Sequence, residues 1–174
     1  MDINEAEIAG PCRITLGGVD LGHTTGGVLL TAERDFEDVK VDRYGETPID
    51  KVLTGNRAMV NFTLAQPNAR NLKYAMPETS SYDGAGALDR TDLGADAGFS
   101  LRTRALQLVI HPLKNGDSDL SDDVVIYKAV SAENVELPFR IDEQKVLELT
   151  FTALVDESYG AGRRLGHIGA ANVS

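Results

Sequence analysis

Apolar and polar residues alternate along several segments of the chain, which predicts β-strands. In residues 57–65 the apolar residues occupy the even positions, and in residues 145–154 they occupy the odd positions. Residues 105–110 share this period of two, and residues 122–130 are rich in β-branched and aromatic side chains. Strands with one apolar and one polar face are typical of an antiparallel sheet covered on one side.

Shorter signals complete the predicted secondary structure. Residues 13–20 contain a Gly17-Gly18 turn that predicts a tight hairpin. The Gly-rich segment 25–31 leads into residues 33–42, which again alternate with period two. One helix is predicted over residues 65–76, with Pro67 suited to its first turn, and Pro77 ends it.

Two long segments show no regular pattern. Residues 43–56 contain Gly45, Pro48 and Gly55, and residues 78–100 are rich in Ser, Asp, Gly and Ala. Irregular loops of more than about 12–15 residues are uncommon in compact domains and are often functional or disordered. In a monomer these two segments would be costly exposed surface, whereas in an assembly they would be available for contacts. Residues 78–100 are interpreted either as a loop on the outer surface or as an arm that reaches a neighbour.

Composition narrows the class of protein. The 174 residues include 27 Asp plus Glu against 17 Lys plus Arg, a formal net charge of −10, which argues against a protein that grips nucleic acid through positive charge. The length suits one domain. The chain has no apolar run long enough to span a membrane, and its acidic start lacks the pattern of a signal peptide. Its single cysteine, Cys12, is expected to be a free, buried thiol in a reducing compartment.

The residues that usually carry chemistry form no recognisable site. His23, His111 and His167 lie far apart, without metal-ligand spacing, and structural or turn roles are expected for His111 and His23. The glycine doublets match neither a P-loop nor a dinucleotide fingerprint. The acidic run 117–123 lacks the central Gly and terminal Glu of a calcium loop, so it is interpreted as a charged hairpin loop. We expect no catalysis, no metal and no cofactor.

The order of these elements resembles that of a known family. The chain begins with the hairpin in residues 10–22, continues through a Gly-rich strand into a charged strand and a loop with Pro48, Ile49 and Asp50, and then forms the strand 57–64. Near its end a polar linker precedes an alternating strand that finishes in Thr-Phe-Thr-Ala-Leu at residues 150–154. This layout, over residues 10–154, resembles the major tail tube proteins of long-tailed (siphovirus-like) bacteriophages. Their folds are similar to those of contractile-tail inner tubes and of the Hcp tube of type VI secretion.

The resemblance implies a mainly β fold, a β-sandwich or partial barrel with one flanking helix. It also implies hexameric rings that stack into a hollow tube, with four strands of each subunit lining the bore. Residues 1–174 would form one domain, with an N-terminal arm at 1–10, an inter-ring loop at 43–56, an irregular insertion at 78–100 and a C-terminal arm at 156–174.

Two sets of residues acquire roles from this resemblance. An acidic bore would let DNA slide past without sticking, although an ordinary solvent-facing sheet surface is the alternative for the same carboxylates. The predicted bore lining is Glu33, Asp35, Glu37, Asp38 and Asp42. The predicted inter-ring contacts are Arg43, Tyr44, Glu46, Ile49, Asp50, Lys51, Val52 and Leu53, with Arg43, Glu46, Asp50 and Lys51 forming ion pairs between rings.

The implied function is a virion structural subunit that conducts genomic DNA during ejection. Its partners would be other copies of itself, the tail tip and tail terminator proteins, and a tape-measure protein in the bore, with no specific DNA binding and no membrane insertion. Assembly would take place in the host bacterial cytoplasm. Two alternatives remain: an Hcp-like contractile or secretion tube, and a soluble β-sandwich binding module. The absence of Trp counts against a carbohydrate-binding module, which usually needs aromatic platforms.

Overall fold

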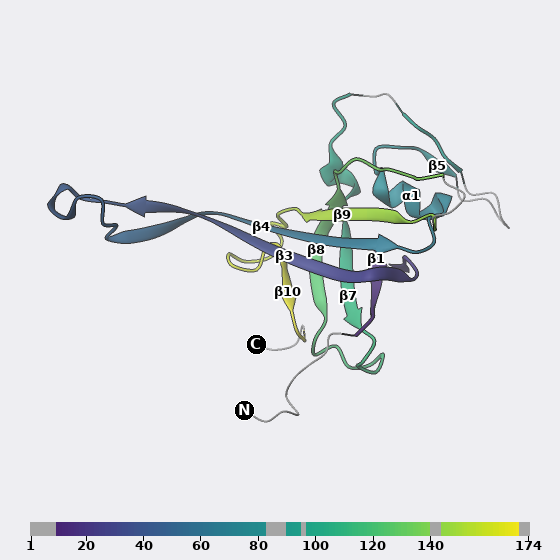
Figure 1. Cartoon of the computed structure of the whole chain (residues 1–174), viewed down its shortest axis with the longest axis horizontal. Helices are drawn as coiled ribbons and strands as arrows, with labels where there is room; N and C mark the ends of the chain where they lie inside the picture. The colour runs from purple at the N-terminus through teal and green to yellow at the C-terminus, as the bar shows by residue number, and fades with distance from the viewer. Residues whose placement is uncertain (1–9, 83–89, 95–96, 140–143, 171–174) are drawn as a thin grey trace.

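A computed structural model describes residues 10–82, 90–94, 97–139 and 144–170, and it shows a mainly β protein (Figure 1). Eight strands form one antiparallel sheet, and two short strands, β5 (Ser81–Tyr82) and β6 (Arg90–Thr91), pair separately. The strands of the main sheet are β1 (Cys12–Leu16), β2 (Val19–Asp20), β3 (Thr24–Val39), β4 (Asp50–Leu64), β7 (Leu106–Pro112), β8 (Val124–Ser131), β9 (Leu147–Ala153) and β10 (Gly166–Ile168).

The main sheet curls around the core without closing. Its order is β2-β1-β7-β8-β9-β4-β3, with β10 paired to β8 beside this path, and every pair is antiparallel. In Figure 1, β7 and β8 run steeply across the direction of β3, β4 and β9. Strand β1 also contacts β3, so the two ends of the sheet approach each other although they are not paired. This arrangement confirms the predicted mainly β fold, in the form of an unclosed antiparallel sheet.

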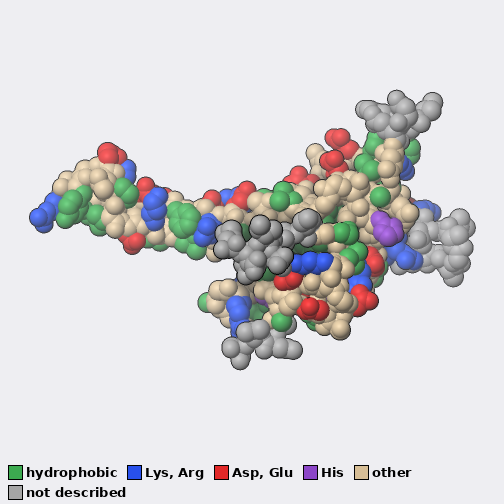
Figure 2. Space-filling model, turned by 60° about the horizontal axis from the view of Figure 1, so that its bottom comes forward, with side chains coloured by type: hydrophobic (Ala, Val, Ile, Leu, Met, Phe, Trp, Pro, Cys, Tyr) green, Lys and Arg blue, Asp and Glu red, His purple; other side chains and the backbone are tan. Residues whose placement is uncertain are grey.

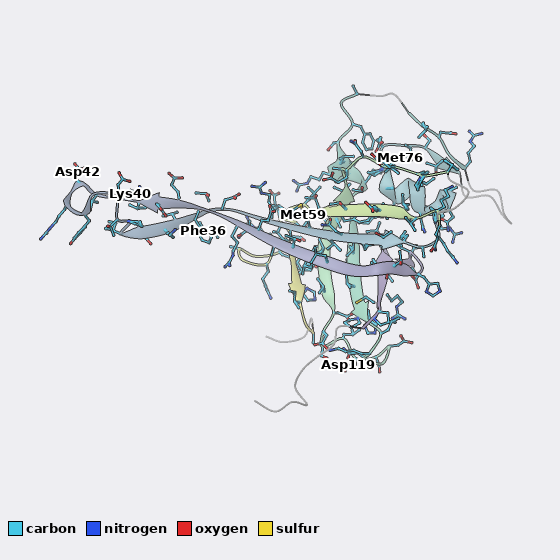
Figure 3. All side chains as sticks on the ribbon, in the orientation of Figure 1. Phe36, Lys40, Asp42, Met59, Met76 and Asp119 are labelled. Carbon is cyan, nitrogen blue, oxygen red and sulfur yellow. The ribbon has the colours of Figure 1, made fainter. Side chains whose placement is uncertain are left out.

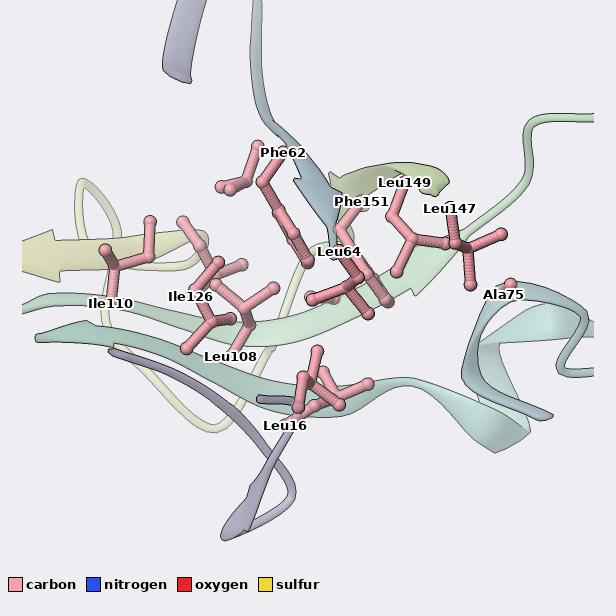
Figure 4. Packing of buried hydrophobic residues seen from close by; sticks show 14 residues of the cluster. Leu16, Phe62, Leu64, Ala75, Leu108, Ile110, Ile126, Leu147, Leu149 and Phe151 are labelled. Atoms are coloured by element: carbon pink, nitrogen blue, oxygen red, sulfur yellow. The ribbon is translucent and has the colours of Figure 1, made fainter. Parts of the chain in front are cut away.

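The core lies between the two halves of the curled sheet (Figure 4). Phe62 of β4 and Phe151 of β9 stack with ring centroids 5.8 Å apart and an interplanar angle of 7°. Both come from the alternating apolar positions that predicted these strands. The largest side chains with under 2% exposure are Phe151, Ile14, Leu64, Leu108, Leu147 and Val60. Burying large apolar side chains is the main source of stability for such a fold.

One helix, α1 (Ala69–Ala75), flanks the sheet. It begins later than predicted, because the Asn68 side chain caps it by accepting a 2.8 Å hydrogen bond from the backbone N–H of Asn71. The buried Asn71 amide in turn donates to the Leu21 carbonyl at 3.0 Å. Ala75 is buried in the core cluster, so this side of the helix packs against the sheet.

Two predicted strand boundaries change. Strand β3 ends at Val39, the 3-10 helix η2 (Asp42–Tyr44) follows, and β4 already begins at Asp50, so half of the segment predicted to be irregular is strand. The Gly17-Gly18 turn is present with φ angles of 58° and 81°. A second 3-10 helix, η3 (Leu101–Arg104), precedes β7. The N-terminal arm at 1–10 lies outside the described residues except for Gly10, and the insertion at 78–100 is described only in part.

The described part of the predicted C-terminal arm, residues 156–170, lies along β8, where β10 pairs with the first residues of that strand. Tyr159 stacks on Tyr127 of β8 at 3.7 Å, and the Tyr127 hydroxyl lies 3.0 Å from His167 Nδ1. Lys128 forms a 3.1 Å ion pair with Asp156. Aromatic stacking and strand pairing therefore hold this segment against the body.

Candidate assembly interface

The hairpin of β3 and β4 projects far beyond the rest of the molecule (Figure 1). Strand β9 supports β4 only from Met59 to Leu64, whereas β3 and β4 stay paired to Val39 and Asp50. We call the projecting part, residues 32–58, the arm. Within the arm, each strand pairs only with the other among the described strands. The arm is therefore a two-stranded ribbon, a structure that is only marginally stable alone in water.

The arm exposes a concentration of large apolar side chains. Phe36 is 50% exposed and Tyr44 56%, far above the 0–5% of most core side chains. Exposed apolar patches of this kind mark surfaces that contact another molecule. The exposed apolar residues of the arm are Phe36, Val39, Val41, Tyr44, Ile49, Val52 and Leu53.

The register places part of this apolar surface on the face of the arm that continues the core. Val60 and its partner Leu30 lie on the core side of the sheet, and each second pair beyond them lies on the same side. A register shift between Asp35 and Phe36 inserts one residue into β4, which leaves Phe36 opposite Leu53 on that side. The side of the sheet that faces the core in the body therefore continues along the arm, where no described residue covers it.

The five predicted bore-lining carboxylates do not share one face. Glu33, Asp35 and Glu37 alternate onto the face opposite the core, together with Leu29 and Thr31. Asp38 lies on the other face, where its carboxylate pairs with Lys51 at 3.1 Å. Asp42 lies at the tip, at the start of η2, and is labelled in Figure 3.

Cations of β4 offset much of the charge on β3. Arg57 donates to Asp35 at 2.6 Å, and this hydrogen bond raises the pKa of Arg57 above its usual value, which keeps the guanidinium charged. Residues 32–58 contain seven acidic and five basic side chains, so the arm is close to neutral and most of the net charge of −10 lies elsewhere. Figure 2 shows the two charge types interspersed with apolar side chains along the arm.

The tip of the arm is held by contacts within the chain. Lys40 pairs with Glu46, the Ile49 N–H donates to the Val39 carbonyl at 2.8 Å, and the Arg43 guanidinium lies 5.8 Å from the centroid of the Tyr44 ring. Of the side chains predicted to form ion pairs between rings, Glu46 and Lys51 thus already have partners in their own subunit. Tyr44, Ile49, Val52 and Leu53 are exposed, as an interface requires.

The side chains that usually carry chemistry do not come together in the described part of the chain. His111 and Asp123 are both buried, and the imidazole Nδ1 lies 2.6 Å from the carboxylate. This is the structural role predicted for His111, and His23 is exposed in the connection between β2 and β3. Cys12 is a free, partly buried thiol whose pKa is raised by that burial. In the described part of the chain, no three His, Cys, Asp or Glu side chains cluster closely enough to hold a metal ion.

Sequence reasoning did not single out Phe36, Val39 and Val41 as interface residues. Their alternation with charged residues is that of an ordinary strand, and the sequence carries no sign that the strand lacks a covering layer. The structure supplies the signal that the sequence lacks, because β3 has 16 residues and β4 has 15, whereas β9 has seven. Where β3 and β4 extend beyond β9, they form a ribbon that no other described strand pairs with or covers.

Comparison with known proteins gave a family match that includes the arm. No curated protein matches the chain. No helix among the described residues is both long and apolar enough to cross a membrane. The sequence model of one family, described as phage tail tube protein, matches residues 13–161, which include the arm and reach from β1 to β9. The chain therefore belongs to the phage tail tube protein family and is a structural component of the virion.

Proposed function

We propose that this chain assembles into stacked hexameric rings that form the hollow tail tube through which the phage genome leaves the capsid. The observation that carries the proposal is the arm, a two-stranded ribbon with seven large exposed apolar side chains in a member of a tube-forming family. Such a ribbon gains a stable environment only when another subunit covers it.

The free edge of the sheet supports ring formation. Strand β3 pairs only with β4 among the described strands, so its other edge presents unpaired backbone groups along the strand. Long exposed edges promote uncontrolled aggregation unless something pairs with them. A closed ring in which β3 of one subunit meets the next subunit removes these edges.

The bore is proposed to be lined by β8, β9, β4 and β3, which are consecutive in the sheet. Six subunits would close a barrel of about 24 strands, roughly 37 Å across the backbone without tilt and about 48 Å with a 40° tilt. Duplex DNA, roughly 20 Å wide, passes such an opening after side chains are subtracted. The face opposite the core, with Glu33, Asp35 and Glu37, would then face the DNA and repel its phosphates.

Electron microscopy of the purified chain tests the proposal directly. We expect hollow tubes with regular ring striation, and their six-fold symmetry should be visible in end-on views. A chain that stays monomeric at high concentration, with an intact fold by circular dichroism, would contradict the tube.

Labelling tests the assignment of the bore face. In a Cys12→Ser background, Glu37→Cys and Asp38→Cys place a thiol on opposite faces of neighbouring positions in β3. After reaction with a bulky maleimide, we expect extra density inside the bore for the first variant and none there for the second. Bore density from Asp38→Cys alone would reverse the assignment.

A further inference from the structure

A pocket lies at the end of the body where β7 begins. It has a volume of about 190 Å³, and its floor is apolar and buried, with Leu16 at 2% exposure, Phe151 at 1% and Val130 at 4%. An apolar cavity of about 150 Å³ suffices to hold a benzene molecule, so this one accepts a leucine-sized group.

The lining of this pocket is positively charged, in a chain of net charge −10. Its two charged lining residues are Lys73, from α1, and Arg104, the last residue of η3. Arg104 lies 5.9 Å from the Phe99 ring centroid and makes no ion pair with a described carboxylate. No described carboxylate lines the pocket. The pocket therefore suits an apolar side chain next to an anion.

The β7–β8 loop, residues 113–123, lies at the opposite end of β7 and carries an apolar side chain next to an anion. Strand β7 has seven residues, which separates its ends by about 20 Å. Asp119 is labelled at the lower end of the body in Figure 3, while Met76, close to the pocket in sequence, is labelled at the upper end. Leu120, next to Asp119, is 52% exposed.

Ion pairs hold this loop and leave its tip available. Arg13 pairs with Asp117 at 2.8 Å and Lys114 with Asp122 at 3.4 Å, whereas Asp119 pairs with no described cation. Asp119 accepts a hydrogen bond from the Ser121 N–H at 3.1 Å. Hydrogen bonds from Ser121 lower the pKa of Asp119, so its carboxylate is ionised at neutral pH. The tip presents Leu120 beside an anion in a preformed loop, which reduces the entropy lost on docking.

We propose that Leu120 of one subunit enters this pocket on a neighbouring subunit, with Asp119 facing Arg104. The inference rests on the proposed self-assembly and names one of its contacts. Because loop and pocket lie at opposite ends of β7, the contact is head-to-tail, and each subunit keeps one free loop and one free pocket for the next copy. Head-to-tail contacts of this kind build rings or stacks rather than closed dimers.

Charge exchange tests this contact. Asp119→Lys and Arg104→Glu each place like charges together, and we expect each variant alone to require at least about tenfold more protein to assemble, a loss of roughly 1.4 kcal/mol per contact. In an equimolar mixture of the two variants, the introduced lysine can face the introduced glutamate while the native pair forms at alternate contacts, so assembly should return. Single variants that assemble like the native chain, or a mixture that stays as poor as its components, would overturn the contact.

A matched pair of leucines tests the apolar part. Leu120→Ser should weaken assembly, whereas Leu113→Ser, in the same loop and 49% exposed, should leave it unchanged. Equal loss from both would overturn the specific docking of Leu120. Thermal unfolding of every variant checks the fold. If the native chain forms tubes and these variants do too, only this contact fails; if the native chain does not assemble at all, the proposed tube fails and the contact with it.

Discussion

The two halves of β4 have the same backbone conformation and opposite surroundings. From Met59 to Leu64 the strand lies between β3 and β9, and alternate side chains are buried, with Val60 at 1% exposure and Leu64 at 0%. From Asp50 to Ala58 it pairs with β3 alone, and Val52 and Leu53 are 48% and 47% exposed. A single strand thus passes from the middle of a sheet into an uncovered ribbon.

Strand pattern and burial are therefore separate properties of this chain. Both halves are extended strand, although only residues 57–64 alternate cleanly, and burial depends on how many layers and partners surround the strand. The first half of β4 contains apolar side chains that no described residue of its own subunit covers. The missing layer is therefore expected from another copy of the chain.

The largest effect on stability is expected in the core, where β9 packs beside β4. Phe151→Ala removes the ring that stacks on Phe62 and leaves a cavity at the centre of the core. We expect the free energy of unfolding to fall by about 3–5 kcal/mol. Denaturant titration of the monomer measures this change, and a loss below about 1 kcal/mol would show that the core is not packed as described.

A smaller effect is expected from the buried pair at the end of β7. Asp123→Ala removes the partner of His111 and leaves a buried imidazole without its hydrogen bond, at a cost of about 1–3 kcal/mol. Asp117→Ala, in the same loop, breaks the exposed pair with Arg13 and should cost about 0–1 kcal/mol. Equal costs for the two variants would contradict the difference in burial.

The C-terminal segment should respond to acid. The backbone hydrogen bond from Ser158 and the contact with Lys128 lower the pKa of Asp156 below its usual value. The contribution of this carboxylate is complete above its ordinary pKa of about 3.9 and is lost as the pH falls through the lowered value. The protection of the β10 amides, meaning their exchange rate relative to the intrinsic rate at the same pH, should therefore fall below about pH 4 in the native chain. Asp156→Asn should exchange faster at neutral pH and lose this acid step, while Glu157→Gln should keep it.

The smallest effect on stability is expected from the arm, together with a complete effect on assembly. Phe36→Ser combined with Leu53→Ser removes a cross-strand apolar pair that no other described residue covers. We expect the monomer to unfold within about 0.5 kcal/mol of the native chain, because both side chains are already solvent-exposed. Tubes should be absent in electron micrographs. Tubes of normal length would show that this face of the arm makes no contact between subunits.

The sequence predicts much of this fold, because strands with alternating burial carry their own signature. Residues 57–65 and 145–154 alternate clearly, and they form the central pair β4 and β9. Residues 50–56 lack a clean alternation, since the extra residue opposite the Asp35–Phe36 step interrupts the period, so the sequence suggests a loop there. Strand β10 has three residues and forms only because β8 offers an open edge. The sequence of β10 does not show that this edge exists.

The candidate interface was predictable only in outline. The resemblance places contacts at residues 43–56, and four apolar residues of that segment are exposed. It gives no information on which face each carboxylate occupies, because Asp38 and Glu37 are neighbours in sequence and opposite in space. The cations that offset the charge of β3 come from β4, and only the register brings them together.

The decisive experiment is hydrogen exchange along β4, in the dispersed subunit and in the assembled particle. Amides of residues 59–64 lie between two strands and should exchange slowly in both states. Amides of residues 50–58 should exchange rapidly in the dispersed subunit and at least about tenfold more slowly after assembly, since a neighbouring copy then covers the arm. Equal exchange rates for residues 50–58 in the two states would contradict the conclusion that this ribbon is the part of the molecule completed by another subunit.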